Sequence, residues 1–243
     1  MKQYSDYDLY RFNTMHLHCI AKLVFSPETE EELSELLLSF KKKNRSFHII
    51  SACSNIVLPP KISIPVIVLT TFNKVFNIEN RVIEVGASVR IQHLIRQAQK
   101  YNLGGIEYLF SVPCTVGGAT VMNAGRGSGN RSIGNYIERV RCLNLISGDI
   151  EILNHDECKF EYRNSIFLHG DRIVLSTFLK LEENYTIEND INERKEFALK
   201  YLDDRRPSCG SIFKIYNDRI MRKLMGLRVG GGRMVAEKSK LDK

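Results

Sequence analysis

The stretch Ser111-Val-Pro-Cys-Thr-Val-Gly-Gly-Ala-Thr-Val-Met-Asn-Ala-Gly125 decides the fold of this 243-residue chain. A Gly-Gly pair follows a Thr-Val step, and an Asn-Ala-Gly turn closes the stretch. Such glycines let the backbone approach a ligand closely, and the N–H groups of the turn can form a concave anion site. Pro113 fixes one φ angle near the start. The Gly pair alone fits an ordinary turn equally well, but the whole string favours a cofactor-binding loop.

Two strand–helix units precede this loop. Ser26-Pro27 has the residues of a helix start, and Leu33, Leu36, Leu37 and Phe40 then form a buried stripe. Apolar runs at 47–50 and 66–69 are of strand length, so residues 17–70 predict a strand–helix–strand unit with parallel strands. The second unit has a strand at 81–86 and a helix that begins after Ser88.

Further elements are expected after the loop. The stretches 136–146 and 173–181 have the apolar patterns of strands. Residues 182–192 are polar and are interpreted as a linker, and a helix is predicted from Asp190 to Arg205. This order of elements indicates an α+β protein.

Composition excludes several classes of protein. The net charge is +7, and residues 219–243 hold +6 of it, which favours phosphorylated ligands. This segment lacks the interleaved aromatic residues of a nucleic-acid interface, so no nucleic-acid partner is expected. The six cysteines and six histidines form no metal-binding pattern, so we expect reduced thiols and no metal. No apolar run is long enough to span a bilayer, and we expect a cytoplasmic protein without a signal peptide.

Five short motifs occur in a specific order along the chain. They are Asn13-Thr14-Met15, Ser54-Asn55, the loop 111–125, Tyr162-Arg163-Asn-Ser165-Ile-Phe167, and Pro207-Ser-Cys-Gly-Ser211-Ile-Phe-Lys214. In this combination the chain resembles the flavin-dependent UDP-N-acetylenolpyruvoylglucosamine reductases, also called UDP-N-acetylmuramate dehydrogenases. The resemblance covers about residues 13–237. It implies an oxidoreductase that reduces UDP-N-acetylglucosamine enolpyruvate to UDP-N-acetylmuramate with NADPH through FAD, in peptidoglycan synthesis.

The resemblance also implies roles for individual residues. Arg163 would bind the substrate carboxylate and stabilise the enolate-like intermediate, and Ser211 would donate the proton; these are the expected catalytic residues. Tyr162 and Lys214 would shape the substrate site. Eight residues would hold FAD: Ser54, Asn55, Pro113, Thr115, Gly117, Gly118, Asn123 and Gly125. Outside these motifs, Arg163 alone fits a surface ion pair and Ser211 alone fits a turn or helix cap.

The chain departs from the family pattern at several positions. Ser51-Ala52-Cys53 stands where the family has three glycines, so Ala52 and Cys53 are expected to be strained if the turn needs positive φ. Cys114 also replaces a glycine, and Ile215-Tyr216 replaces Asn-Pro. The family's late Glu, which acts beside the Arg, has no counterpart before Lys243. A natural shortened relative and an incomplete reading frame would both explain this.

From these observations we predict a two-subdomain FAD-binding fold of the PCMH/VAO type, followed by a truncated α+β substrate domain. The FAD-binding domain is expected at 1–185, with subdomains at about 1–72 and 73–185, and the substrate domain at 190–243. We expect a monomer that acts on a UDP-sugar. The alternatives are an FAD-binding relative with a different substrate and a non-catalytic FAD-binding paralogue.

Overall fold

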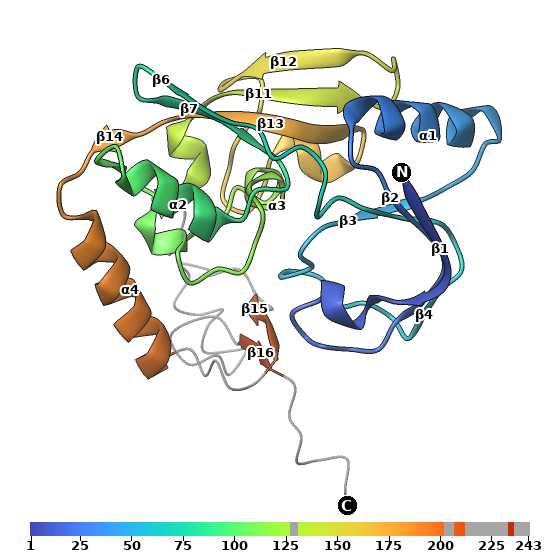
Figure 1. Cartoon of the computed structure of the whole chain (residues 1–243), viewed down its shortest axis with the longest axis horizontal. Helices are drawn as coiled ribbons and strands as arrows, with labels where there is room; N and C mark the ends of the chain where they lie inside the picture. Colours follow the sequence, from blue (N-terminus) through green and yellow to red (C-terminus); the bar gives the residue numbers. More distant parts are fainter. Residues whose placement is uncertain (127–130, 202–206, 212–232, 236–243) are drawn as a thin grey trace, which may run out of the picture.

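The computed structural model describes residues 1–126, 131–201, 207–211 and 233–235 of the chain (Figure 1). Two larger β-sheets account for most of the strands in this part of the protein. Helix α1 lies where the two sheets meet, and α2 and α3 lie below the second sheet in the view of Figure 1. Helix α4 and the strands β15 and β16 follow at the bottom of the same view.

The first sheet contains the N-terminal strands in the order β1-β2-β5-β3, with β4 beside β2. Strands β2 and β5 are parallel, as are β5 and β3, which confirms the predicted parallel unit. Strand β1 is antiparallel to β2 and was not predicted, because its residues are mostly polar and exposed. The bounds are β1 Lys2–Asp8, β2 Ile20–Ser26, β3 His48–Ile50, β4 Lys61–Ile62 and β5 Val66–Val68.

Helix α1 (Glu30–Lys42) buries the predicted apolar stripe, but it begins later than expected. Ser26 is the last residue of β2, and the N-cap is Thr29, whose Oγ1 accepts a hydrogen bond from the backbone N–H of Glu32 at 3.3 Å. The Glu32 carboxylate accepts in turn from the backbone N–H of Glu28 at 2.8 Å. This reciprocal pair resembles a capping box, which a Thr followed three residues later by Glu predicts better than Ser-Pro does.

The second sheet is antiparallel and has the order β12-β11-β13-β7-β6. Strand β13 lies at its centre and is buried along most of its length, as the predicted strand at 173–181 requires. The bounds are β6 Phe76–Glu79, β7 Val82–Gly86, β11 Ile137–Asn144, β12 Ile150–Asn154 and β13 Arg172–Lys180.

Helix α2 (Ile91–Gln99) carries the expected buried face but lacks the predicted cap. Its N-cap position is Arg90, which makes no side-chain cap bond. The Ser88 hydroxyl instead donates to the Leu69 carbonyl oxygen at 2.6 Å, so it joins the second unit to the end of β5. The prediction for Ser88 was wrong because this buried carbonyl group needed a donor.

Short elements complete the described structure. They are α3 Val116–Val121, β8 Leu103–Gly104, β9 Gly125–Arg126, β10 Arg131–Ser132, β14 Glu182–Glu183, β15 Ser208–Ser211, β16 Arg233–Val235, and the 3-10 helices η1 Leu9–Phe12, η2 Glu107–Leu109, η3 Ile133–Tyr136 and η4 Ile166–His169. Helix α4 spans Ile187–Tyr201 and packs on η2. The stretch predicted as a linker therefore contains β14 and the first turn of α4, where Ile187 and Ile191 are buried.

The hydrophobic core joins the two sheets. One cluster combines residues of α1 and the first sheet with Leu143, Ile173 and Leu175 of the second sheet. Arg141 of β11 also forms an ion pair with Glu30 of α1. These contacts fix the relative position of the two sheets, and with it the space between the turn after β3 and helix α3. No helix in the described part of the chain has the length and apolarity needed to cross a bilayer.

Candidate functional site

A cavity of about 850 Å³ lies where the loops of both sheets meet. Its wall includes the turn 51–56, parts of the stretch 108–126, the segment 167–174 and strand β15. Arg163 and Arg194 also line it. The volume is in the upper part of the range that ligand sites have, about 300–1,000 Å³. The cavity therefore unites four of the five sequence motifs.

The turn that follows β3 contributes Ser54 and Asn55 to the cavity wall. Cys53 has a φ of 43°, so the expected left-handed residue is present, whereas Ala52 is not in that region. No backbone N–H from residue 52 to residue 55 donates a hydrogen bond to another described residue. These donors are therefore free for an anion, which is the role that a turn of this kind serves at phosphate sites.

Thr115 connects this turn to the cofactor loop. Its hydroxyl is 3.1 Å from the Ser51 hydroxyl, and it accepts a hydrogen bond from the backbone N–H of Gly118 as the N-cap of α3. Both Thr115 and Pro113, which are predicted to bind the cofactor, line the cavity. This pair of hydroxyl groups is thus one direct contact between the two walls of the cavity.

The glycine pair contributes to the site by the room that its missing side chains leave, because its N–H groups are bonded within the protein. The Gly117 N–H donates to the Ala87 carbonyl oxygen at 2.8 Å, and a Cβ at Gly117 would lie 2.8 Å from the Cβ of Ala87. A Cβ at Gly118 would meet nothing closer than the Thr115 hydroxyl at 3.5 Å, so the cavity has room beside it. The N–H groups of this glycine pair are both bonded within the protein, so the pair does not provide the expected anion site.

Asn123 holds the wall together and does not line the cavity. Its Nδ2 donates to the Glu161 carbonyl oxygen at 2.8 Å, and its Oδ1 accepts from the Gly134 N–H at 2.9 Å. Both ends of the amide are committed, so the side chain has a structural role and the predicted direct contact with a cofactor is not supported. Gly125 does line the cavity, and a Cβ there would lie 2.3 Å from the Arg131 carbonyl oxygen.

Arg163 presents a guanidinium without a counter-ion. The residue is half-buried, lines the cavity and has a φ of 57°. It makes no hydrogen bond or ion pair with any described residue, whereas Arg141 and Arg172 each pair with a carboxylate. A long side chain in the left-handed region is uncommon, and such conformations concentrate at functional sites. This arginine is available to a carboxylate ligand.

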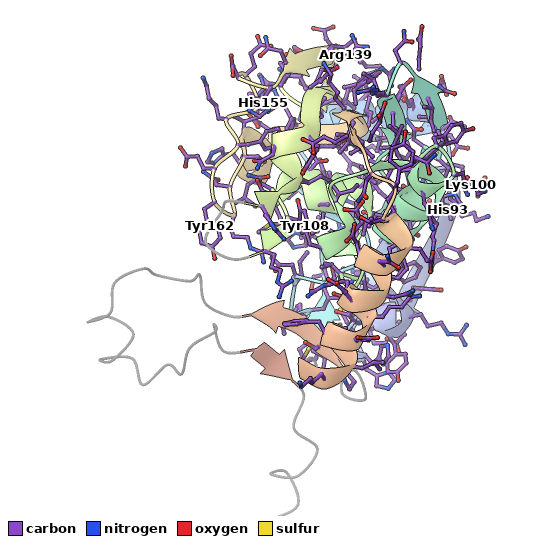
Figure 2. All side chains as sticks on the ribbon, turned by 90° about the vertical axis from the view of Figure 1, so that its left-hand side faces the viewer. His93, Lys100, Tyr108, Arg139, His155 and Tyr162 are labelled. Carbon is purple, nitrogen blue, oxygen red and sulfur yellow. The ribbon has the colours of Figure 1, made fainter. Side chains whose placement is uncertain are left out.

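The neighbours of Arg163 divide into structural and peripheral residues. The Ser165 hydroxyl is buried and donates to the Val121 carbonyl oxygen at 2.7 Å, which ties the loop to α3. Tyr162 does not line the cavity, and in Figure 2 it lies toward the margin of the molecule while Tyr108 lies more centrally. The predicted contact of Tyr162 with substrate is therefore absent from the described cavity wall.

Strand β15 brings the last motif to the same cavity. Ser208, Cys209 and Gly210 line it, and the Ser208 N–H donates to the Thr14 carbonyl oxygen at 3.1 Å. Ser211 is the last residue of this strand and its backbone is paired with Arg233, but its side chain lies outside what the structure describes. Lys214 lies outside the described residues altogether.

Several buried polar atoms of the cavity wall have no hydrogen-bond partner among the described residues. They are the Tyr108 hydroxyl, the Ser111 hydroxyl, and Nε and Nη1 of Arg194. Buried polar atoms in proteins are nearly always paired, so these atoms are available to a polar ligand in the cavity. The sequence did not predict Tyr108 or Arg194 as site residues, because neither belongs to a motif and only their burial shows that a partner is missing.

Three cysteines line the cavity, and burial makes each of them a poor nucleophile. Burial raises the pKa of the Cys53 thiol to about 11 and that of Cys114 to about 12. The pKa of Cys209 is also raised by burial. Since the thiolate is the reactive species, these side chains are neutral wall residues at physiological pH. No group of His, Cys, Asp and Glu among the described residues is arranged to hold a metal ion.

Comparisons with known proteins agree with this geometry. The FAD binding domain family matches residues 21–154. The UDP-N-acetylenolpyruvoylglucosamine reductase of Moorella thermoacetica is 33% identical over 240 residues, which cover 95% of this chain and 77% of that protein. The enzyme of the same name from Caldicellulosiruptor saccharolyticus is 30% identical over 241 residues, covering 93% of this chain and 75% of the relative.

Solved structures show the same fold. The crystal structure of UDP-N-acetylenolpyruvylglucosamine reductase from Thermus caldophilus superposes with a TM-score of 0.71 at 26% identity, covering 94% of this chain and 82% of that one. Cholesterol oxidase from Brevibacterium sterolicum shares the fold alone, with a TM-score of 0.57 at 12% identity, covering 75% of this chain and 38% of that one. The predicted α+β FAD-binding fold is confirmed. The chain belongs to the UDP-N-acetylenolpyruvoylglucosamine reductase family of FAD-binding oxidoreductases.

Proposed function

We propose that the chain binds FAD in this cavity and uses NADPH to reduce UDP-N-acetylglucosamine enolpyruvate to UDP-N-acetylmuramate. The observation that carries the proposal is the guanidinium of Arg163, which has no partner in the described part of the chain and lies on the same cavity wall as the cofactor loop and strand β15. Family membership supports the choice of this substrate. The buried polar atoms without described partners support a ligand with many hydrogen-bonding groups.

The cavity fits a flavin dinucleotide. Free backbone N–H groups at residues 52–55 suit a pyrophosphate, the open space at Gly118 allows close approach, and the Ser111 hydroxyl lacks a partner. We infer that FAD is held by the cavity-lining residues Ser54, Asn55, Pro113, Thr115, Gly117, Gly118 and Gly125. When bound, FAD supplies the hydride chemistry, and the protein supplies position and electrostatic field.

Arg163 has the chemistry to hold and activate the enolpyruvyl group. Its guanidinium is permanently charged and can donate two parallel hydrogen bonds to the substrate carboxylate. When hydride reaches C3, negative charge develops on C2 and on this carboxylate, and a fixed cation stabilises that charge more than it stabilises the ground state. The absence of a protein carboxylate beside Arg163 among the described residues keeps it available for this task.

Ser211 is the proposed donor of the proton to C2. A serine hydroxyl is a weak acid near neutral pH, so the transfer depends on the basicity that C2 gains as hydride arrives. The position is consistent with this role because Ser208, Cys209 and Gly210, the residues just before it, line the cavity. In the substrate complex, the Ser211 hydroxyl would have to reach C2 of a substrate whose carboxylate is bound by Arg163.

An anaerobic experiment in two steps tests the proposal. NADPH is added to the FAD-loaded protein and bleaching of the flavin absorbance is followed; the enolpyruvyl substrate is then added and the return of absorbance is followed. We expect both steps in the wild type. Arg163→Met and Ser211→Ala should leave the first step unchanged and slow the second by about 100-fold or more, the usual effect of removing one transition-state donor.

The alternatives give different results. A flavoprotein that NADPH bleaches but that the enolpyruvyl substrate does not reoxidise would act on another substrate. A protein that cannot be loaded with FAD would contradict every redox role. Equal slowing of both steps by Ser211→Ala would remove this residue from the role of acid. Arg139→Met is a matched control, because Arg139 is an exposed arginine that does not line the cavity.

A further inference from the structure

Two arginines of the cavity wall meet on one aromatic ring. The Arg126 guanidinium of β9 lies 4.4 Å from the centre of the Phe197 ring, and the Arg194 guanidinium of α4 lies 4.9 Å from it. Both arginines line the cavity. Stacking on an aromatic face orients a guanidinium and leaves its N–H groups in the ring plane free to donate.

The charge of this pair is not compensated by the described part of the protein. Neither Arg126 nor Arg194 forms an ion pair with a described carboxylate, and Nε and Nη1 of Arg194 are buried without an acceptor. Burial lowers the pKa of Arg194, and the positive charge of Arg126 lowers it further. Arg141, another half-buried arginine, is by contrast neutralised by its ion pair with Glu30. Arg126 is exposed but Arg194 is half-buried, and a half-buried cation beside a second cation is stabilised by a ligand that supplies negative charge.

We propose that Arg126 and Arg194, oriented by Phe197, form a subsite for the diphosphate of a nucleotide. A diphosphate suits two neighbouring guanidiniums because its several oxygens can accept paired hydrogen bonds from both groups. Helix η2, which contacts both α4 and β9, carries the unpaired hydroxyl of Tyr108 to the same cavity as a further donor. The subsite uses other residues of the same cavity wall than Arg163, which is assigned to a carboxylate, and the turn at 52–55, which is assigned to FAD.

Two nucleotides could bring this diphosphate: the UDP-sugar substrate and NADPH. The assignment to these two sources rests on the proposed function, whereas binding of a diphosphate can be measured without turnover. Calorimetry on the FAD-loaded full chain with UDP, uridine and NADP⁺ as probes separates them. Uridine has the base and ribose of UDP without phosphate, so it isolates the contribution of the charged group.

We expect Arg194→Met and Arg126→Met each to weaken UDP binding by roughly 10- to 100-fold, the effect of losing charge-assisted hydrogen bonds, and to leave uridine binding unchanged. Methionine keeps an apolar stem over the Phe197 ring, and Arg194→Lys should retain part of the affinity because it retains the charge. Arg139→Met is the matched control: Arg139 stacks on Phe178 at 4.2 Å, and Figure 2 shows it at the top of the molecule, far from Tyr108.

Each outcome decides one point. Loss of UDP affinity with unchanged NADP⁺ affinity supports the subsite and assigns it to the sugar nucleotide, and the reverse supports the subsite and assigns it to the dinucleotide. Unchanged affinity for both, or an equal loss in Arg139→Met, overturns the subsite. If UDP binding depends on Arg194 but the wild type turns over no enolpyruvyl substrate, the proposed function fails and the subsite stands. If the wild type turns over the enolpyruvyl substrate but neither Arg126→Met nor Arg194→Met changes the KM, the proposed function stands and the subsite fails.

Discussion

Asn123 illustrates how a motif residue can support a site without contacting the ligand. Asn123→Ala would leave the Glu161 carbonyl oxygen and the Gly134 N–H unpaired, and would place alanine at a φ of 40°. We expect the free energy of unfolding to fall by about 3 kcal/mol, measured by chemical denaturation. Asn164→Ala, which removes only a long, exposed bond to Glu161, should cost less than about 0.5 kcal/mol. A small loss of stability with a large loss of FAD affinity would contradict this role.

Ser111 has the opposite character, because its hydroxyl is buried and unpaired. Ser111→Ala should leave the FAD-free protein as stable as the wild type, or up to about 1 kcal/mol more stable. The same change should raise the Kd for FAD by about fivefold or more, since the ligand is the expected partner. The contrasting control is Ser165→Ala, which breaks a 2.7 Å hydrogen bond to Val121 and should destabilise the FAD-free protein. Loss of stability in FAD-free Ser111→Ala would show that the hydroxyl already has a partner.

At the residue scale, the sequence motifs single out residues that lie in the cavity wall, such as Pro113, Gly118 and Arg163. Their roles toward a cofactor or a substrate stay predictions. The unpaired side chains of Tyr108 and Arg194 could not be predicted in this way, because an unsatisfied polar atom is a property of the packed structure and not of a local pattern. The two hydrogen bonds of the Asn123 amide are likewise a property of the packed structure, so the motif alone could not predict them.

At the scale of elements, the site depends on the contact between the turn after β3 and helix α3. Thr115→Val would remove the N-cap acceptor for Gly118 and the contact with the Ser51 hydroxyl. We expect a loss of about 1–2 kcal/mol in stability and weaker FAD binding, because both cavity walls lose their common anchor. Thr115→Ser keeps the hydroxyl and should keep both properties. If the Thr115→Val variant binds FAD as tightly as the Thr115→Ser variant, the contact between the hydroxyls of residues 51 and 115 has no part in shaping the cavity.

The starts of helices show where sequence patterns were insufficient. The buried stripes of α1 and α2 were predicted from apolar spacing, because burial of one face sets the period of 3.6 residues. Their first residues were not, since Ser26 ends a strand and Ser88 bonds to the Leu69 carbonyl oxygen. A serine can satisfy any nearby backbone group, and only the tertiary structure decides which one it is.

At the scale of the whole molecule, the buried thiols predict how stability depends on pH. Burial raises the pKa of Cys142 to about 11, while an unfolded cysteine ionises near pH 8.5. The contribution of the protonated Cys142 thiol to the free energy of unfolding is complete below pH 8.5 and is lost as the pH rises toward the pKa of the folded state. The free energy of unfolding should therefore fall by up to about 1.4 kcal/mol per pH unit for this thiol in that window.

Chemical denaturation with a reductant between pH 8 and pH 10.5 measures this dependence. Cys142→Ala should have a shallower slope than the wild type, because the variant lacks the titrating group. Val140→Ala is the matched control: it truncates a fully buried, non-titrating side chain of the same strand, so it should lower stability equally at every pH. Parallel slopes for the wild type and Cys142→Ala would show that this thiol does not titrate differently in the two states.

The arrangement of the two sheets brings three distant segments of the chain to one cavity. The cofactor loop at 113–125, Arg163 and strand β15 line the same cavity, and this is the central claim about function. A crystal structure of the FAD-loaded chain tests it most directly. We predict that the dinucleotide lies along residues 113–125 with its ring system in contact with Arg163 and next to β15. A dinucleotide bound on a face remote from Arg163 and β15 would contradict the claim.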